Sequence, residues 1–398
     1  MPPTAVHQPT LPASRRPPPP GGGGVPAADG RLLRSFARAA PALTGYLTVR
    51  LTGLLVLARW AHLKGLGVWP TLATSWDSDW YLGIADHGYA RELGTALDAN
   101  NLAFFPLYPV LVKAVAGVTP GSRASVALVI AVLSSLVAAW GIFAVGDRLH
   151  GRRTGTLLAL LWGALPVAVV QWMGYTESLF TALTAWALYA ALGTCWLWAG
   201  VLSALAGLTR PTGVAVAAAV VVSGLVALVR GRNLRALAGV LLAPLGWCGY
   251  VAWVGLRLGR WDGYFAVQKL WRNTWDGGGV TLSAVRDYLA YDTNPQLLLV
   301  VVSVVLVVSA ALYLLCLVDR QPLVLLVFTG VLLLVVLGSG GVYFPRARFL
   351  LPGFPLLLPV AAALARARRP VALVVLAGAV LSSSWFGGYL LLVWRGPP

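Results

Sequence analysis

Long apolar segments alternate with short polar ones along most of the chain. Many of the apolar runs are about 20 residues long, enough for a helix to cross the hydrocarbon core of a bilayer. Spans are expected near 43–61, 124–145, 155–172, 177–193, 196–209, 212–229, 236–256, 296–318, 322–339, 347–364 and 371–392. The pattern predicts an all-α polytopic membrane protein with about eleven transmembrane helices, since such helices satisfy their own backbone polar groups.

The segments outside these runs predict the domain organisation. Residues 1–40 are rich in Pro, Gly and Arg and have little to bury, so a disordered cytoplasmic tail is expected there. Residues 41–398 then form a single transmembrane domain. It has a first outer loop at 62–118 and a second at 257–294. Two prolines interrupt the shorter apolar stretch at 102–118, which predicts a re-entrant or interfacial helix.

Composition and charge narrow the class of protein. Of the 398 residues, 58% are hydrophobic and only 11% are charged, too few to cover a water-facing surface. A soluble enzyme and a disordered chain are therefore excluded. The net charge of +17 comes from arginines clustered in short loops, so it records topology and not nucleic-acid binding. These clusters place the N-terminus in the cytoplasm, with 62–118 and 257–294 outside.

The first outer loop carries an acidic and aromatic motif. It contains Trp76, Asp77, Asp79 and, further on, His87. Aromatic residues hold a segment at headgroup depth, and partial desolvation raises the basicity of a carboxylate, as a general base requires. The alternative is an acidic loop with an aromatic belt. Asp77 and Asp79 could also hold a divalent cation, so metal dependence is left open.

Further polar residues are expected on the same face. Glu177 begins a span, where it is either functional or a favourable charge at a helix N-terminus. Arg210 lies in a Thr-Arg-Pro-Thr-Gly turn, while Arg346 and Arg348 follow Tyr-Phe-Pro. Arginines on an outer face can bind a lipid phosphate, and headgroup anchoring is the alternative. Aromatic residues of 257–294 predict interfacial anchoring, with acceptor binding as the alternative.

Four of these motifs together resemble the PIG-V family, which comprises GPI mannosyltransferase II and its bacterial relatives. The resemblance covers about 45–215 and resumes at 346–351. The motifs are Trp76-Asp77 with Tyr81-Leu82, Ile84-Ala85 and Gly88-Tyr89; Ala103-Phe104-Phe105-Pro106 with Pro109; Gly174-Tyr175; and Glu177-Ser178-Leu179-Phe180. The chain differs from the family at Arg210-Pro211-Thr212-Gly213, where Arg-Ser-Asn-Gly is frequent.

The resemblance implies a GT-C fold and an inverting glycosyltransferase that uses polyprenyl-phosphate-linked mannose. It implies that Asp77 is catalytic and that Arg348 is the basic residue before the late Phe-Leu pair. We expect Asp77 to act as base and Arg348, Arg346 and Arg210 to bind the donor phosphate. Trp76, Asp79, His87 and Glu177 would orient the acceptor or support Asp77.

Other functions remain to be distinguished. A GT-C transferase for another lipid-linked sugar, such as arabinose or rhamnose, is the first alternative. A transporter or flippase is the second, but charges gather at the predicted outer face, apart from Arg50 and Arg59. The Arg-rich, Lys-poor composition predicts a bacterial plasma-membrane protein, with a glycolipid, glycan or protein as acceptor.

Overall fold

The computed structural model describes residues 28–231 and 233–398. The chain divides into a unit of residues 1–38 and a unit of residues 39–398. The described part of the first unit is the start of helix α1, which begins at Ala28. Residues 28–40, predicted to be disordered, are thus helical, while the rest of the predicted tail lies outside the described residues. The fold and site below belong to residues 39–398.

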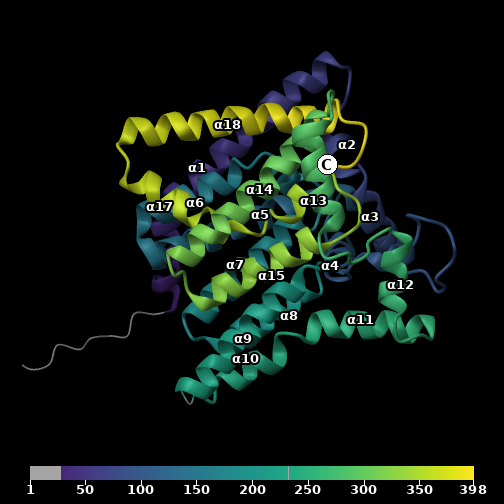
Figure 1. The fold of residues 1–398 in the computed structure, drawn as a ribbon, viewed down its shortest axis with the longest axis horizontal. Coiled ribbons are helices and arrows are strands. Elements are labelled where there is room, and N and C mark those ends of the chain that lie inside the picture. Colours follow the sequence, from purple (N-terminus) through teal and green to yellow (C-terminus); the bar gives the residue numbers. More distant parts are fainter. Residues whose placement is uncertain (1–27, 232) are drawn as a thin grey trace, which may run out of the picture. The chain divides into compact units, whose positions relative to one another are not determined.

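The described residues are helical almost throughout, as the apolar pattern predicts (Figure 1). The α-helices are α1 (Ala28–Leu63), α2 (Val68–Ala73), α3 (Asp77–His87), α4 (Leu107–Ala116), α5 (Arg123–His150), α6 (Arg152–Gly163), α7 (Glu177–Leu192), α8 (Trp196–Gly207), α9 (Gly213–Gly231), α10 (Ala236–Leu242), α11 (Leu245–Leu258), α12 (Gly263–Leu270), α13 (Gly279–Arg286), α14 (Leu297–Val318), α15 (Leu323–Gly338), α16 (Arg346–Phe349), α17 (Leu358–Arg366) and α18 (Arg369–Leu392). Short helical turns of other types are η1 (Asn101–Ala103), η2 (Ala168–Trp172), η3 (Asp287–Tyr291) and η4 (Phe354–Leu357).

Six described helices are long and apolar enough to cross a membrane. They are Arg34–Leu63, Arg123–His150, Gly213–Gly231, Ala236–Leu258, Leu297–Val318 and Arg369–Leu392. The expected number of about eleven is not reached, because the other predicted spans form helices of only 9 to 16 residues. An apolar run indicates that a segment avoids water. It does not distinguish a transmembrane helix from a short helix that is buried by neighbouring helices.

The segment predicted to be re-entrant or interfacial forms η1 and the ten-residue helix α4. At about 1.5 Å per residue, α4 is far too short to span a bilayer. Pro106 is the residue before α4, where a missing backbone N–H removes no helical hydrogen bond. The second predicted outer loop is also largely helical, since it contains α12 and α13.

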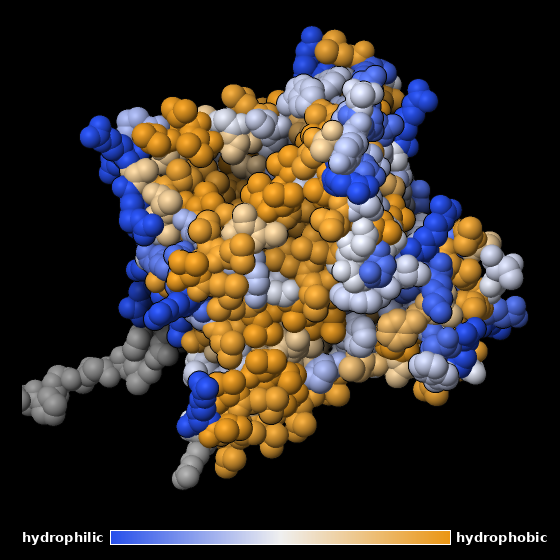
Figure 2. All heavy atoms as spheres, in the orientation of Figure 1, coloured by the Kyte–Doolittle hydropathy of each residue, from blue (hydrophilic) through white to orange (hydrophobic). Residues whose placement is uncertain are grey.

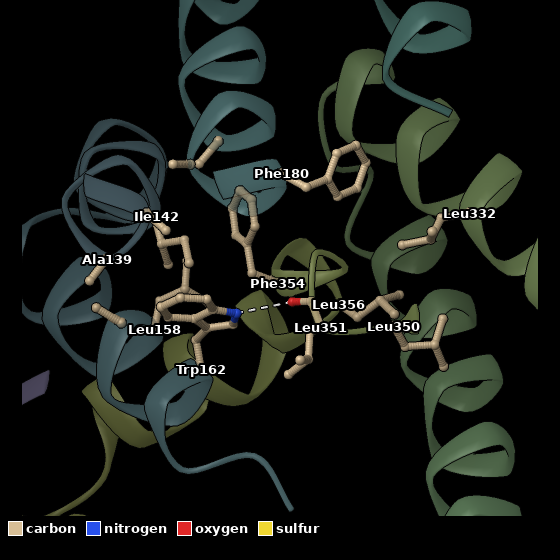
Figure 3. Close-up of a cluster of buried hydrophobic side chains, with 14 of the residues drawn as sticks. Ala139, Ile142, Leu158, Trp162, Phe180, Leu332, Leu350, Leu351, Phe354 and Leu356 are labelled. Carbon is tan, nitrogen blue, oxygen red and sulfur yellow. Dashed lines mark hydrogen bonds between the residues drawn. The ribbon is translucent and has the colours of Figure 1, made fainter. Parts of the chain in front are cut away.

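The core joins α5, α6 and α7 to the segment that follows α16. Trp162 of α6 is fully buried, and its indole N–H donates to the carbonyl of Leu351 at 3.0 Å (Figure 3). Buried indoles need such a partner, since an unpaired N–H is costly in an apolar core. This contact fixes the position of the backbone three residues after Arg348.

Apolar side chains also face outward from the longest helices. On α18, Leu373 and Val374 are 66% and 72% exposed, and Val318 ends α14 at 77%. Figure 2 shows a broad hydrophobic area over this face, with hydrophilic residues gathered to either side of it. Exposed apolar surface of this extent is expected of a protein whose solvent is lipid. Buried Arg50 donates to the carbonyl of Gly163 at 3.0 Å, so one of the two arginines in the first predicted span, Arg50 and Arg59, has a structural partner.

Candidate active site

Asp77 is the first residue of α3, and an unusual backbone conformation precedes it. Trp76 has φ 52° and ψ −112°, a region that residues with a side chain rarely adopt. Such strain costs on the order of 1–3 kcal/mol and persists only where the surrounding structure imposes it. The backbone N–H of Asp77 donates to the hydroxyl of Tyr175 at 3.4 Å. The turn at Trp76 therefore sets the direction in which Asp77 enters α3.

Glu177 is brought beside α3 by a close approach of two backbones. The N–H of Gly174 donates to the carbonyl of Leu72 at 2.9 Å. A Cβ atom on Gly174 would lie 3.0 Å from Oγ of Ser78 and 3.2 Å from the carbonyl oxygen of Ala73, so glycine permits the contact. Helix α7 then starts at Glu177, whose charge is favourable at a helix N-terminus.

Arg348 connects these two carboxylates. Its Nη2 lies 2.8 Å from Oδ2 of Asp77, and its Nε lies 3.2 Å from Oε1 of Glu177. The residue belongs to the four-residue helix α16, and its guanidinium lies over the rings of Tyr175 and Phe349. The planar fork of arginine allows one side chain to bind both acids, which a lysine ammonium does less well.

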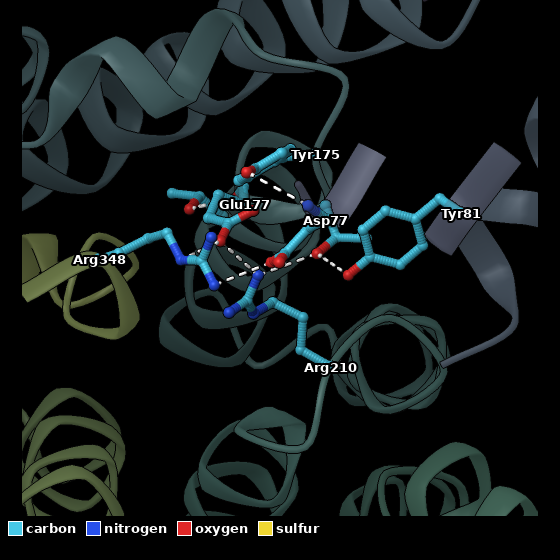
Figure 4. A network of polar contacts seen from close by, with 8 residues as sticks. Asp77, Tyr81, Tyr175, Glu177, Arg210 and Arg348 are labelled. Atoms are coloured by element: carbon cyan, nitrogen blue, oxygen red, sulfur yellow. Dashed lines mark hydrogen bonds and ion pairs between the residues drawn. The ribbon is translucent and has the colours of Figure 1, made fainter. Parts of the chain in front are cut away.

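Arg210 completes the network from the turn between α8 and α9. Its Nη1 lies 2.6 Å from Oε1 of Glu177 and donates to Oγ1 of Thr176 at 2.9 Å. The hydroxyls of Thr176 and Tyr81 lie 3.1 Å apart. Figure 4 shows the side chains of Arg210, Arg348, Asp77 and Glu177 converging from separate segments of the chain.

Asp77 is more exposed than the other three charged residues of the network. The side chain of Asp77 is 20% exposed, whereas those of Glu177, Arg348 and Arg210 are 2%, 6% and 8% exposed. Formal charges balance, with two carboxylates and two guanidiniums, which lowers the cost of burying them. Among the described residues, Nη1 of Arg348 and Oε2 of Glu177 have no hydrogen-bond partner. The more exposed acid is thus the one able to meet a substrate.

Two tyrosines that the predicted site did not include contact the network. Tyr175 accepts from the backbone of Asp77 and lies beside Arg348, and Tyr81 contacts Thr176. Burial raises the pKa of both hydroxyls well above the ordinary value, so both stay neutral at physiological pH. Both residues occur in the motifs of the PIG-V resemblance, which was the available signal for them.

A cavity of about 190 Å³ opens onto Asp77, Arg210 and Arg348. Its lining also includes aromatic and amide side chains from the two predicted outer loops, namely Phe104, Phe105, Gln268, Trp271 and Asn273. An apolar cleft with a few convergent polar groups is the usual form of a small-molecule site. Residues from five separate segments therefore share one cavity.

Four predicted site residues belong neither to the ionic network nor to the lining of the cavity, namely Trp76, Asp79, His87 and Arg346. Arg346 donates to Thr281 and to the carbonyls of Ser339 and Gly341, so it does not form a clamp with Arg348. The i, i+2 spacing of the two arginines explains this, because such residues point to different sides of a helix. His87, at the end of α3, is exposed and does not line the cavity.

Asp79 is also separated from the site. Its side chain is exposed, and it lies two residues after Asp77 on α3. The limited desolvation of its carboxyl raises its pKa. Side chains at i and i+2 of a helix do not face each other, so Asp77 and Asp79 do not fit a shared metal ligand pair. Over the described ranges, no group of three or more His, Cys, Asp or Glu residues could hold a metal ion.

Comparison with known sequences gives a partial similarity. No protein-family model matches the chain. GPI alpha-1,6-mannosyltransferase 2 of Rattus norvegicus is 33% identical over 153 residues, which cover 35% of this chain and 29% of the rat protein. The Mus musculus protein of the same name is 32% identical over 153 residues, with the same coverage. The chain thus matches less than a third of the length of these relatives.

Comparison with solved structures defines the fold. The archaeal oligosaccharyltransferase AglB from Archaeoglobus fulgidus, in complex with an inhibitory peptide and a dolichol-phosphate, aligns with a TM-score of 0.51 at 14% identity. The apo form of the Archaeoglobus fulgidus oligosaccharyltransferase gives 0.51 at 12% identity, and each match covers 89% of this chain and 56% of the other. The chain is therefore an all-helical membrane protein with a GT-C-like fold.

Proposed function

We propose that the chain is an inverting membrane glycosyltransferase that transfers mannose from polyprenyl-phosphate-mannose to an acceptor hydroxyl. The observation that carries this proposal is the partly exposed carboxylate of Asp77 in one cavity with two buried arginines. A base beside a cationic phosphate site is the arrangement that glycosyl transfer from a lipid phosphate requires. The partial similarity to GPI alpha-1,6-mannosyltransferase 2 and the GT-C-like fold support the same function.

In this mechanism the acceptor oxygen attacks the anomeric carbon of the donor from the face opposite the phosphate. Asp77 accepts the proton of the acceptor hydroxyl as the new C–O bond forms. The bond between the anomeric carbon and the phosphate oxygen breaks, and its electron pair leaves with the polyprenyl phosphate. Arg348 and Arg210 stabilise the negative charge that develops on that oxygen.

The ion pair between Asp77 and Arg348 implies that the donor rearranges the site when it binds. Nη2 of Arg348 lies 2.8 Å from Oδ2 of Asp77. A donor phosphate that binds Arg348 competes with this contact, because a guanidinium forms charge-assisted hydrogen bonds with phosphates as well as with carboxylates. Donor binding thereby leaves the carboxylate of Asp77 available to the acceptor hydroxyl.

Glu177 serves in this proposal as a positioning residue. Its Oε1 contacts both guanidiniums, at 2.6 Å from Arg210 and 3.2 Å from Arg348. Its side chain is 2% exposed, so it is far less accessible to an acceptor than Asp77. Glu177 therefore holds the two arginines at a fixed spacing around the phosphate, and Asp77 remains the catalytic acid–base group.

The reaction is proposed to take place on the extracytoplasmic face of the plasma membrane, with a glycolipid, glycan or protein as acceptor. The arginine clusters in the opposite loops support this orientation. A lipid-linked donor also favours a site beside the membrane, because its polyprenyl chain stays in the bilayer.

The proposal is tested by incubating the purified protein, in lipid nanodiscs, with polyprenyl-phosphate-mannose and candidate acceptors. Mass spectrometry should detect a product heavier by one hexose, and NMR should show inversion at the anomeric carbon. Transfer from a polyprenyl-phosphate-linked arabinose or rhamnose, with none from the mannose donor, would establish the alternative sugar specificity. Movement of lipid without any glycoside product would instead support the transporter.

A further inference from the structure

The cavity at Asp77 has a second, uncharged part. It is formed by Phe104, Gln268, Trp271 and Asn273, which we call the amide–aromatic wall. Phe104 follows η1 in the first predicted outer loop, and the other three belong to α12 and the turn after it. The sequence pattern favoured membrane anchoring for this second loop, yet these side chains line the cavity that holds the ionic network.

The amide side chains of this wall are held in place by one another. Nε2 of Gln268 donates to the hydroxyl of Tyr264 at 2.9 Å, and Nδ2 of Asn273 donates to Oε1 of Gln268 at 2.9 Å. Arg272 has φ 57°, and this left-handed residue turns the chain so that Asn273 also donates its backbone N–H to the carbonyl of Gln268. The two amides are therefore preorganised before any ligand arrives.

The rings of the wall are fixed in a similar way. Trp271 donates its indole N–H to the carbonyl of Asn100 at 2.9 Å and makes edge contacts with Trp80 and Phe104, each with ring centroids 5.4 Å apart. Trp80 and Phe104 stack at 5.5 Å. Such ring pairs stabilise one another beyond their simple burial, so the aromatic surface keeps its shape.

The chemistry of this wall selects its ligand. After the bonds above, Gln268 retains one N–H and one acceptor lone pair, and Asn273 retains one N–H and its carbonyl oxygen. These neutral donors and acceptors match hydroxyl groups, while the adjacent rings offer an apolar surface to C–H groups. The cavity has a volume of about 190 Å³, more than the roughly 150 Å³ of a cavity that encloses benzene, and it is open to solvent, so a pyranose ring can pack against the wall while its outer hydroxyls extend from the cavity.

We propose that the amide–aromatic wall binds one neutral hexopyranose ring, with Gln268 and Asn273 bonded to its hydroxyls and Trp271 and Phe104 packed against its C–H face. The inference rests on the proposed function, because the sugar belongs to the donor or to the acceptor of that reaction. It assigns sugar binding to the second predicted outer loop, and phosphate binding to Arg210 and Arg348.

Binding can be measured without turnover. Saturation-transfer NMR with methyl α-D-mannopyranoside and the nanodisc-embedded protein should show transfer to the sugar protons in the wild type. Asn273→Ala combined with Gln268→Ala should weaken binding roughly tenfold or more, through the loss of two neutral hydrogen bonds. Trp261→Ala is the matched control, because Trp261 lies in the same loop, is 93% exposed and does not line the cavity. The absence of a wild-type signal, or equal signals in all three proteins, would overturn the proposal.

Kinetics then identify which sugar uses the wall. In the transfer assay, the double variant should raise the KM for the acceptor if the wall holds the acceptor sugar, or for the donor if it holds the donor sugar. Unchanged KM values for both substrates would contradict the proposal even if transfer occurs. If the NMR signal depends on Gln268 and Asn273 but no mannose is transferred, the proposed function fails while the sugar site stands. The variant Trp271→Phe tests the aromatic part of the wall, because it replaces the indole with a smaller ring and does not leave a large cavity.

Discussion

Asp77 and Arg348, from opposite halves of the sequence, form an ion pair in which Nη2 of the arginine lies 2.8 Å from Oδ2 of the acid. The arginine side chain is 6% exposed and that of the acid 20%, so the pair lies at the boundary between the core and the cavity. In the proposed reaction a donor phosphate that binds Arg348 competes with this contact and leaves the carboxylate of Asp77 available to the acceptor hydroxyl. The predictions below follow from the pair and its neighbours.

Asp77→Asn should reduce the rate of mannose transfer by about 10²–10⁴-fold, as expected for loss of a general base. The substitution nearly preserves shape, so insertion and donor binding should persist. Asp79→Asn is the matched control on the same helix and should retain most of the activity, because Asp79 is exposed and outside the cavity. The prediction is checked by measuring initial rates of mannose transfer in nanodiscs. Near-normal turnover by Asp77→Asn would exclude this residue as the base.

Arg348→Lys should reduce transfer by about 10²–10³-fold, the range found when one group that stabilises a developing anion is removed. One ammonium group cannot reproduce the simultaneous contacts of Nη2 with Asp77 and of Nε with Glu177. Arg346→Lys is the control, since Arg346 bonds to Ser339 and Gly341 instead. It should leave the donor KM unchanged, and equal effects of the two variants would contradict the assignment of Arg348 to the phosphate.

Glu177→Gln should lower the thermal stability of the detergent-solubilised protein. Removing one partner of a buried ion pair costs about 3–5 kcal/mol. In this variant the two buried guanidiniums of Arg348 and Arg210 would be balanced by only one carboxylate, that of Asp77. The only other glutamate, Glu92, is exposed, so Glu92→Gln provides the comparison. Similar unfolding midpoints for the two variants would show that the charge of Glu177 does not support the fold.

Alkaline pH should destabilise the protein in part through Tyr81 and Tyr175. Burial raises the pKa of both hydroxyls, so the folded chain keeps their protons above about pH 10, where the unfolded chain releases them. The unfolded state then binds fewer protons, and the free energy of unfolding falls as pH rises. Tyr81→Phe with Tyr175→Phe should flatten this decline above about pH 10, and thermal midpoints that run parallel to the wild type there would refute it.

The proposed orientation is tested by labelling at exposed positions, because the site residues themselves are too buried to react. In a background lacking the exposed Cys195 and Cys248, Glu92→Cys should react with an impermeant thiol reagent on intact cells. Arg152→Cys and Arg368→Cys, in the arginine clusters, should react only after permeabilisation. The reverse pattern would place the site in the cytoplasm.

The sequence by itself determined the class of protein and most of the residues of the charged site. Apolar runs require helices in a membrane, since lipid offers the backbone no hydrogen bonds. Glu177 and Arg210 were expected beside the acidic motif because the arginine clusters in the opposite loops placed all three on the same outer face. The resemblance to the PIG-V family implied the catalytic role of Asp77 and singled out Arg348. Local pattern alone supplied the shared face, because that inference needed only the apolar runs and the charged loops between them.

Only the tertiary structure decided which of these residues meet. Arg346 and Arg348 look equivalent in sequence, yet one bonds to the backbone near Ser339 and the other to Asp77. The number of helices long enough to span, and the place of Gln268 and Asn273 in the cavity, were likewise beyond the pattern. Hydropathy records how strongly a segment avoids water, but the direction of a side chain depends on helix rotation and on contacts between segments distant in sequence.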